Sequence, residues 1–198
     1  FFLLFLFSLP VLLEMTFVLS LWLKVVPTNA DLFMQLILIQ RLIDILGYPL
    51  VTLSQACGRV ALYQTVVGVL QWAIFPISWV VLGMGYAAES VFWIGIAISI
   101  VALVAQFYLI NLVVIDFSIS RFLREAVYPS GLVSIASAIL PVAAHHFLSY
   151  GWLRFIIVCV LSLIFSVLSI YTLGLDGDER NALKSYVSRK INRWGLSS

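Results

Sequence analysis

Long apolar runs separated by short polar breaks dominate this chain. A helix of about 20 apolar residues crosses the hydrocarbon core of a bilayer, and each run is close to or above that length. The runs predict six membrane-spanning helices, at residues 1–23, 29–55, 60–84, 89–115, 131–149 and 152–173. No strand-like alternation over about ten residues recurs, as a membrane barrel would require. The pattern therefore predicts an all-α polytopic membrane protein.

The composition supports this class. Of the 198 residues, 63% are hydrophobic and 10% are charged, whereas soluble domains have about 45–50% apolar and about 25% charged residues. The mean hydropathy is +1.13. Cys57 and Cys159 fall in or beside apolar runs without metal-ligand spacing, so we interpret both as small buried hydrophobic residues. We expect no metal site and no cofactor, and the basic residues flank membrane segments rather than forming a nucleic-acid site.

Two polar segments accompany the predicted bundle at 1–173. The longest break, residues 116–130, predicts a short interfacial helix that Pro129 and Gly131 close. The tail, 174–198, begins with a spacing typical of a capping box and continues with apolar residues at helical intervals among basic ones. It therefore predicts a basic amphipathic helix on the anionic cytoplasmic leaflet. Its basic residues also serve as a topology signal, which is the alternative interpretation.

The distribution of Lys and Arg predicts the orientation. With residue 1 in the cytoplasm, the cytoplasmic segments hold eight Lys and Arg residues and the outer segments hold two. Because cytoplasmic loops carry the excess of positive charge, this arrangement is favoured, and it places the C-terminus in the cytoplasm. Residue 1 lies inside an apolar run without a charged leader, so we expect the C-terminal part of a longer protein.

Two opposite charges lie inside the second run. Arg41 and Asp44 occur near its middle, three residues apart, so they share one helix face and can pair. An isolated charge at the centre of a bilayer costs about 2.5–3.5 kcal/mol on insertion scales. Such residues usually face protein or water, so this helix is expected to line a polar cavity of a transport protein.

The same face carries further polar side chains. At about 100° per residue, Arg41, Asp44, Tyr48, Thr52 and Gln55 fall within a sector of about 80°. Gln40 and Gln35 lie to the side of this polar stripe, and Pro49 is expected to kink the helix. The stripe is a hydrated wall that contacts a polar substrate in one interpretation, and a buried ion pair that locks two helices in the other.

The third run adds Gln64 and Gln71, which share a face with Gly68. Glutamine side chains in a bilayer join helices by hydrogen bonds, and they can also bind sugar hydroxyls. Both uses remain open for these two residues.

Glu14 is a lone carboxylate in the first run. It is a candidate site for a coupling proton or cation, and we expect its partner on a helix outside this chain. His145 and His146 lie near a predicted outer helix end, where an interfacial position is favoured over a metal site.

The chain lacks the motifs of common catalytic centres. It has no nucleotide-binding glycine loop, no G-x-S-x-G elbow and no zinc-ligand pair. We therefore expect that it is not an enzyme.

Residues 36–85 resemble a known family. The pattern consists of Pro49-Leu50, Gln55-Ala56-x-Gly58, Tyr63-Gln64 and Pro76-Ile77-Ser78 before a glycine-containing turn. It is similar to the C-terminal lobe of bacterial polysaccharide repeat-unit flippases, in the multidrug/oligosaccharidyl-lipid/polysaccharide exporter superfamily. Residues 9–27, the VYPSG turn and the GLDGDERNALKSYVSRKI tail also fit, so the resemblance covers nearly the whole chain.

The resemblance implies a fold of two pseudo-symmetric helical lobes around a central cavity, with this chain forming most of the second lobe. It implies alternating-access transport of polyprenyl-diphosphate-linked oligosaccharide across the bacterial cytoplasmic (inner) membrane, for O-antigen or other surface polysaccharide. Membrane lipids, a polysaccharide polymerase and other assembly proteins are the implied partners. In such a cavity, Arg41 would suit the diphosphate because its guanidinium matches phosphate geometry.

Three alternatives remain open. A drug/cation antiporter of the same superfamily would have the same fold and another cargo. A membrane-embedded transferase would use His145 and His146, although no acidic or nucleophilic partner is visible in the sequence. A structural membrane subunit would use Arg41 and Asp44 only as a helix lock.

Overall fold

The computed structural model describes residues 1–23, 25–58, 60–113, 118–175, 180–181 and 185. These residues form helices and connecting turns, with no strand among them, so the chain is an all-α polytopic membrane protein. Among the described residues, five helices are long and apolar enough to cross a membrane, and a bent pair near the N-terminus brings the number to six if it counts as one span. The elements, in chain order, are α1 (Phe2–Leu13), α2 (Met15–Trp22), α3 (Ala30–Asp44), η1 (Ile45–Gly47), α4 (Tyr48–Ala56), α5 (Val60–Gly83), α6 (Glu89–Val113), α7 (Ile119–Phe122), η2 (Leu123–Val127), α8 (Tyr128–Phe147), α9 (Trp152–Ser169) and η3 (Ile170–Gly174).

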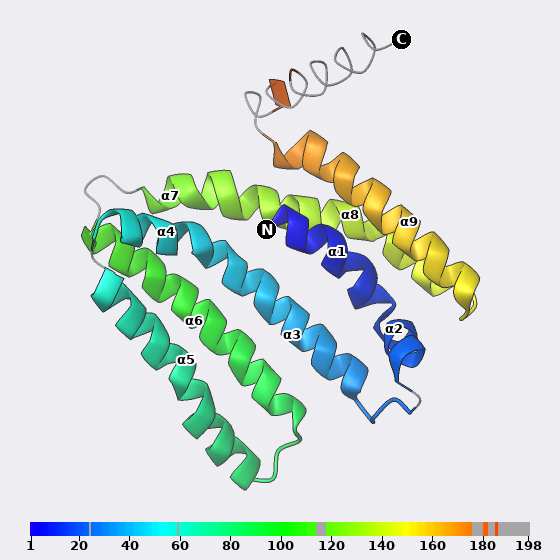
Figure 1. Cartoon of the computed structure of the whole chain (residues 1–198), viewed down its shortest axis with the longest axis horizontal. Helices are drawn as coiled ribbons and strands as arrows, with labels where there is room; N and C mark the ends of the chain where they lie inside the picture. Colours follow the sequence, from blue (N-terminus) through cyan, green and yellow to red (C-terminus); the bar gives the residue numbers. More distant parts are fainter. Residues whose placement is uncertain (24, 59, 114–117, 176–179, 182–184, 186–198) are drawn as a thin grey trace, which may run out of the picture.

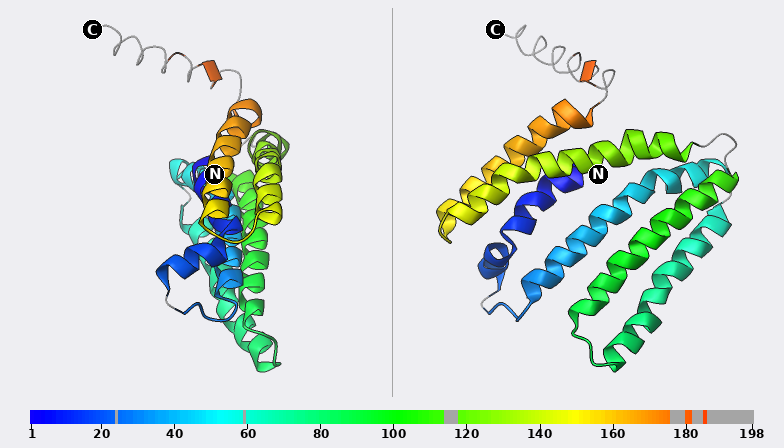
Figure 2. Two further views of the ribbon diagram at one scale, coloured as in Figure 1. Left: turned by 90° about the vertical axis from the view of Figure 1, so that its right-hand side faces the viewer. Right: turned by 180° about the vertical axis from the view of Figure 1, so that it is seen from behind.

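The helices form a fan in two connected groups (Figures 1 and 2). In the first group, α6 lies between α5 and α3 and contacts both. In the second group, α8 and α9 pack together and against α1. Contacts from α1 and α2 to α3 join the groups. Successive long helices run in opposite directions, so the connections gather at two opposite ends of the bundle.

The first run is broken rather than straight. The sequence predicts one helix at 1–23, but α1 and α2 meet at an angle of 82°. Glu14, between them, leaves helical geometry with φ −107° and ψ 28°. Its amide still donates to the carbonyl of Pro10 at 3.0 Å, so α1 ends in regular form before the chain turns. The local hydrophobic pattern does not reveal this bend, because the apolar run continues through it.

The second run, predicted at 29–55, is one span that an intervening 3₁₀ turn divides into two α-helical parts. The α-helix passes into the 3₁₀ turn η1 just before Pro49. A proline ring clashes with the carbonyl four residues earlier and removes one helical donor, so a tighter turn at this point accommodates it. The expected local disturbance is therefore present, while Ala30–Ala56 remains long and apolar enough to cross the membrane as a single element.

The predicted interfacial helix at 116–130 is wrong in one respect. Pro129 and Gly131 do not close it, because α7, η2 and α8 form a continuous helix over Ile119–Phe147. The predicted span at 131–149 thus begins earlier and ends at Phe147. Pro129 occupies the first turn of α8 after the wider π-type turn η2, where the missing amide is tolerated. A side chain at position 131 would meet no neighbouring atom, so packing does not require a glycine there. Gly131 lowers the stability of the helix only through its low helix propensity.

A buried cluster holds the first group together. Leu50 from α4, Tyr63 from α5 and Ile110 from α6 are each at most 1% exposed. The Tyr63 hydroxyl donates to Oε1 of Gln106 at 2.8 Å, which pairs the two buried polar side chains. A side chain at Gly47 would overlap the Gln106 amide, so this glycine permits the close approach of η1 to α6.

Small residues line the contact between α8 and α9. Ser137 on α8 and Ser162 and Ser166 on α9 are fully buried, together with Val133 and Val158. Small side chains let membrane helices approach closely, where van der Waals packing replaces the hydrophobic effect as the main attraction. The Ser137 hydroxyl donates to the carbonyl of Val133 at 2.6 Å on its own helix. The interface therefore depends on shape rather than on interhelical hydrogen bonds of these serines.

The predicted amphipathic tail at 174–198 falls almost entirely outside the described residues. Arg180 is described, and its guanidinium donates to the carbonyl of Thr172 at 3.0 Å and lies 5.3 Å from the centre of the Tyr171 ring. It thus covers carbonyl groups at the end of η3, which lack helical partners.

Candidate functional site

The pair predicted from spacing forms in the last turn of α3. Nη1 of Arg41 lies 3.2 Å from Oδ2 of Asp44. The Arg41 side chain is 65% exposed and that of Asp44 is 19% exposed. The ion pair is therefore not a buried contact that holds two of the described helices together. Its guanidinium lies on an open face of a membrane-spanning segment.

The remaining stripe residues lie on the same segment and are also open. Tyr48, Thr52 and Gln55 are exposed on α4, and the Thr52 hydroxyl donates to the carbonyl of Tyr48 at 3.1 Å. The stripe consists of Arg41, Asp44, Tyr48, Thr52 and Gln55, which we call the α3–α4 polar stripe. It continues from the end of α3 to the end of α4, at one end of the bundle (Figure 1).

The nearby cavity is formed by other residues. A cavity of about 250 Å³ between η1, α4 and the start of α8 is lined by Leu46, Pro49 and Ser130, and not by the stripe. The stripe is thus an exposed surface of this chain rather than the wall of that cavity. Any enclosed space around it would need a further wall opposite α3 and α4.

Gln40 has a different role from the stripe. Its amide donates to the hydroxyl of Ser99 on α6 at 3.2 Å. A side chain at Gly95 of α6 would come within 2.8 Å of the Gln40 Oε1, so the two helices are close here. Gln40 therefore joins α3 to α6, which is the helix-linking use of a membrane glutamine.

Gln64 and Gln71 are not brought to the stripe residues by any hydrogen bond among the described residues. Both lie on α5, which α6 separates from α3 (Figure 1). Gln64 is exposed beside Gly68 and Trp72 in a surface cavity of about 490 Å³, and Gln71 is half-buried. The start of α5 contacts α4, but no hydrogen bond among the described residues links either glutamine to the stripe, so a shared substrate surface stays a prediction.

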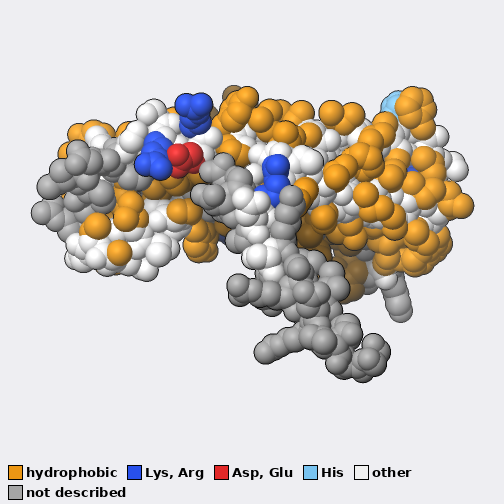
Figure 3. All heavy atoms as spheres, turned by 90° about the horizontal axis from the view of Figure 1, so that it is seen from above, with side chains coloured by type: hydrophobic (Ala, Val, Ile, Leu, Met, Phe, Trp, Pro, Cys, Tyr) orange, Lys and Arg blue, Asp and Glu red, His pale blue; other side chains and the backbone are white. Residues whose placement is uncertain are grey.

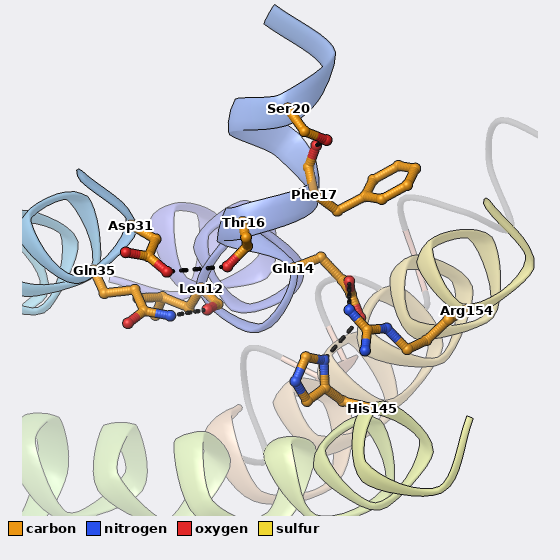
Figure 4. A network of polar contacts seen from close by, with 9 residues as sticks. All are labelled: Leu12, Glu14, Thr16, Phe17, Ser20, Asp31, Gln35, His145 and Arg154. Atoms are coloured by element: carbon orange, nitrogen blue, oxygen red, sulfur yellow. Dashed lines mark hydrogen bonds and ion pairs between the residues drawn. The ribbon is translucent and has the colours of Figure 1, made fainter. Parts of the chain in front are cut away.

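A network of polar side chains surrounds the buried Glu14 (Figure 4). The carboxylate has no exposed side-chain surface. Nη2 of Arg154, on α9, lies 2.9 Å from Oε2, and Nδ1 of His145, on α8, lies 2.8 Å from Oε1. The Arg154 guanidinium also lies 4.9 Å from the centre of the Tyr150 ring. Each carboxylate oxygen therefore has a partner, as a buried charge requires.

This network corrects the expectation that Glu14 pairs with a helix outside the chain. Its partners are within the chain, on the last two long helices. His145 is accordingly more than an interfacial aromatic residue, because it contacts the carboxylate while its side chain remains 36% exposed. The signal available in the sequence was Arg154, a lone basic residue at the start of the predicted run 152–173, on the same predicted side of the membrane as the end of the first run.

Further contacts attach the bend to α3. The Thr16 hydroxyl donates to Oδ2 of Asp31 at 3.1 Å, and the Gln35 amide donates to the carbonyl of Leu12 at 2.9 Å (Figure 4). Leu12 lies in the last turn of α1, where carbonyl groups lose their helical partners. These bonds and the Glu14 network hold the bend from both sides.

Within the described part of the chain, no group of three or more His, Cys, Asp or Glu side chains could hold a metal ion. Comparison of the chain with models of protein families, with curated proteins and with solved structures finds no match. The α3–α4 polar stripe, the Glu14 network and the membrane-spanning helices are therefore the features of this chain that bear on its function.

Proposed function

We propose that this chain forms part of a non-enzymatic carrier that moves polyprenyl-diphosphate-linked oligosaccharide across the bacterial cytoplasmic membrane. The carrier works by alternating access, for surface polysaccharide biosynthesis, with its C-terminus in the cytoplasm. A polysaccharide polymerase and other assembly proteins would receive the cargo. The resemblance of residues 36–85 to repeat-unit flippases supports this cargo, and the fold of membrane-spanning helices is compatible with it.

One observation carries the proposal. The Arg41 guanidinium, on a membrane-spanning segment, is 65% exposed although Asp44 is only 3.2 Å away. A guanidinium facing hydrocarbon is strongly disfavoured, so this face requires water, protein or a polar cargo. A diphosphate fits the requirement because the planar guanidinium can donate two parallel hydrogen bonds to phosphate oxygens.

The rest of the stripe suits the sugar part of the cargo. Tyr48, Thr52 and Gln55 offer hydroxyl and amide groups on the same exposed face as Arg41. Asp44 would compete with the diphosphate for the guanidinium and so favour release after transfer. The polyprenyl chain would remain in the bilayer, because only the charged and hydroxyl-rich head needs a polar path.

The test is glycan export by cells that carry Arg41→Ala or Arg41→Lys, with protein level measured in parallel. We expect Arg41→Ala to lower export by about tenfold or more, since a charge-assisted hydrogen bond contributes about 1.5–3 kcal/mol. Arg41→Lys should retain part of the activity because it keeps the charge but loses the fork geometry.

Protein level should stay unchanged in both variants, because exposed ion pairs contribute only about 0–1 kcal/mol to stability. Thr65→Val on α5 is a control for a change at an exposed polar residue outside the α3–α4 polar stripe. The Thr65 hydroxyl donates to the carbonyl of Ala61 on its own helix, as the Thr52 hydroxyl donates to that of Tyr48, so glycan export should stay unchanged. Normal export by Arg41→Ala would rule out a required contact between Arg41 and the cargo.

A further inference from the structure

A second polar region lies at the end of the bundle where α7 begins. A cavity of about 740 Å³ separates the helix that contains α7 and η2 from the end of η3. One wall has Ser120, Arg121, Arg124 and Glu125, and the other has Leu173 and Gly174. Its volume is in the range of about 300–1,000 Å³ that is usual for small-molecule sites. Figure 3 shows basic side chains and an acidic one on this face, next to hydrophobic side chains.

The charged wall has positive charge available for a ligand. Nε of Arg121 lies 2.8 Å from Oε1 of Glu125, but these side chains are 76% and 57% exposed. Such an exposed pair contributes little and can exchange partners at small cost. Arg124 is exposed and makes no ion pair within the described part of the chain. Among the described residues that line the cavity, positive side chains therefore outnumber negative ones by one.

The opposite wall packs against α1, and a cationic side chain covers one of its terminal carbonyl groups. A side chain at Gly174 would meet the Phe2 ring at 2.8 Å, so the glycine lets the end of η3 lie tightly against α1. The Arg180 guanidinium donates to the carbonyl of Thr172 at 3.0 Å. It thereby neutralises part of the negative end of the helix, which would otherwise face the cavity region.

We infer that this cavity binds the phosphate headgroup of an anionic phospholipid. The two arginines supply the paired donors that phosphate oxygens accept. Pro129, Leu173 and Leu175 line the cavity, and Leu173 is 46% exposed, so apolar surface is available for the acyl chains. A free phosphate ion would not use that surface. The inference is independent of the proposed transport function, because none of these residues belongs to the α3–α4 polar stripe.

Native mass spectrometry of the full chain in detergent can measure binding of phosphatidylglycerol and, for comparison, phosphatidylcholine. Loss of one arginine is expected to weaken phosphatidylglycerol binding about fivefold, and Arg121→Ala with Arg124→Ala to weaken it further. Glu125→Gln should strengthen it, since the competing carboxylate is removed. Phosphatidylcholine has no net charge because its choline balances the phosphate, so its binding should be weaker and should change less in these variants.

His146→Ala is the control, because His146 is an exposed polar side chain that lies outside both the cavity and the α3–α4 polar stripe. Equal phosphatidylglycerol binding by the double variant and the unmodified chain would overturn the inference. A third arm with polyprenyl diphosphate separates the two sources of lipid phosphate. If that lipid binds more tightly than phosphatidylglycerol and depends on Arg124, the cavity is a cargo site and the phospholipid assignment is wrong.

Discussion

Glu14 and Arg154 form an ion pair across 140 positions of the sequence, with Nη2 and Oε2 at 2.9 Å. The Glu14 side chain has no exposed surface and that of Arg154 is only 12% exposed. The pair connects the bend between α1 and α2 to the start of α9. Since a buried charge is stable only with a partner, this contact fixes the position of the bend relative to the start of α9.

Breaking this pair from one side should destabilise the protein strongly. Arg154→Met leaves the Glu14 carboxylate with only His145, so we expect a loss of about 3–5 kcal/mol in the free energy of unfolding. The combination of Glu14→Met with Arg154→Met removes both charges and should be less destabilised than Arg154→Met alone. Unfolding of the purified protein in detergent by increasing denaturant measures the difference.

The pair of Arg121 and Glu125 is the matched control for that experiment. It has a similar distance of 2.8 Å but both side chains are more than half exposed. Arg121→Met should therefore change stability by about 0–1 kcal/mol. A loss from Arg154→Met as small as this control would contradict the view that the Glu14 network is a structural connection.

Exchange of the two charges in the α3–α4 polar stripe should distinguish a cargo-binding role of Arg41 from a purely structural role of the ion pair. In the variant with Arg41→Asp and Asp44→Arg, an ion pair can still form with the same spacing on the helix. We expect unchanged protein level and strongly reduced glycan export, because the guanidinium has moved by three residues. Export at the original level would show that the pair only stabilises the helix, as in the structural-subunit alternative.

Two glycines in the first group should respond differently to the same substitution. Gly47→Ala would overlap the Gln106 amide, which also accepts from Tyr63, so a loss of about 1–3 kcal/mol is expected from overpacking. Gly68→Ala on α5 meets no atom within 4 Å and should be neutral or stabilising by up to about 1 kcal/mol. Thermal unfolding followed by circular dichroism compares them, and equal effects would contradict the close packing at Gly47.

The regular part of the fold could be predicted because it is local. Apolar runs long enough to span a bilayer predicted the helices, and the spacing of Arg41 and Asp44 predicted their contact. The partners of Glu14 could not be predicted in this way, because His145 and Arg154 are 131 and 140 positions away. Only the packing of α1 against α8 and α9 brings these groups together.

Residues at the edge of a helix face were also ambiguous. Gln40 is next to the stripe on the helix, yet its amide bonds to Ser99 because α6 packs on that side. Helical periodicity predicts the direction in which a side chain points around the helix axis. It does not predict on which side of the helix a neighbouring helix packs. Pro129 illustrates the same limit in the backbone, since a π-type turn before it allows the helix to continue.

The bend at Glu14 has a consequence for the path of the chain. Because α2 departs from α1 at 82°, the two helices cannot both follow the same direction across the bilayer. The carboxylate that α8 and α9 contact therefore lies at the corner where the chain turns. His145 covers one of its oxygens while 36% of the His145 side chain stays exposed, so the surroundings of the protein come within one side chain of this buried charge.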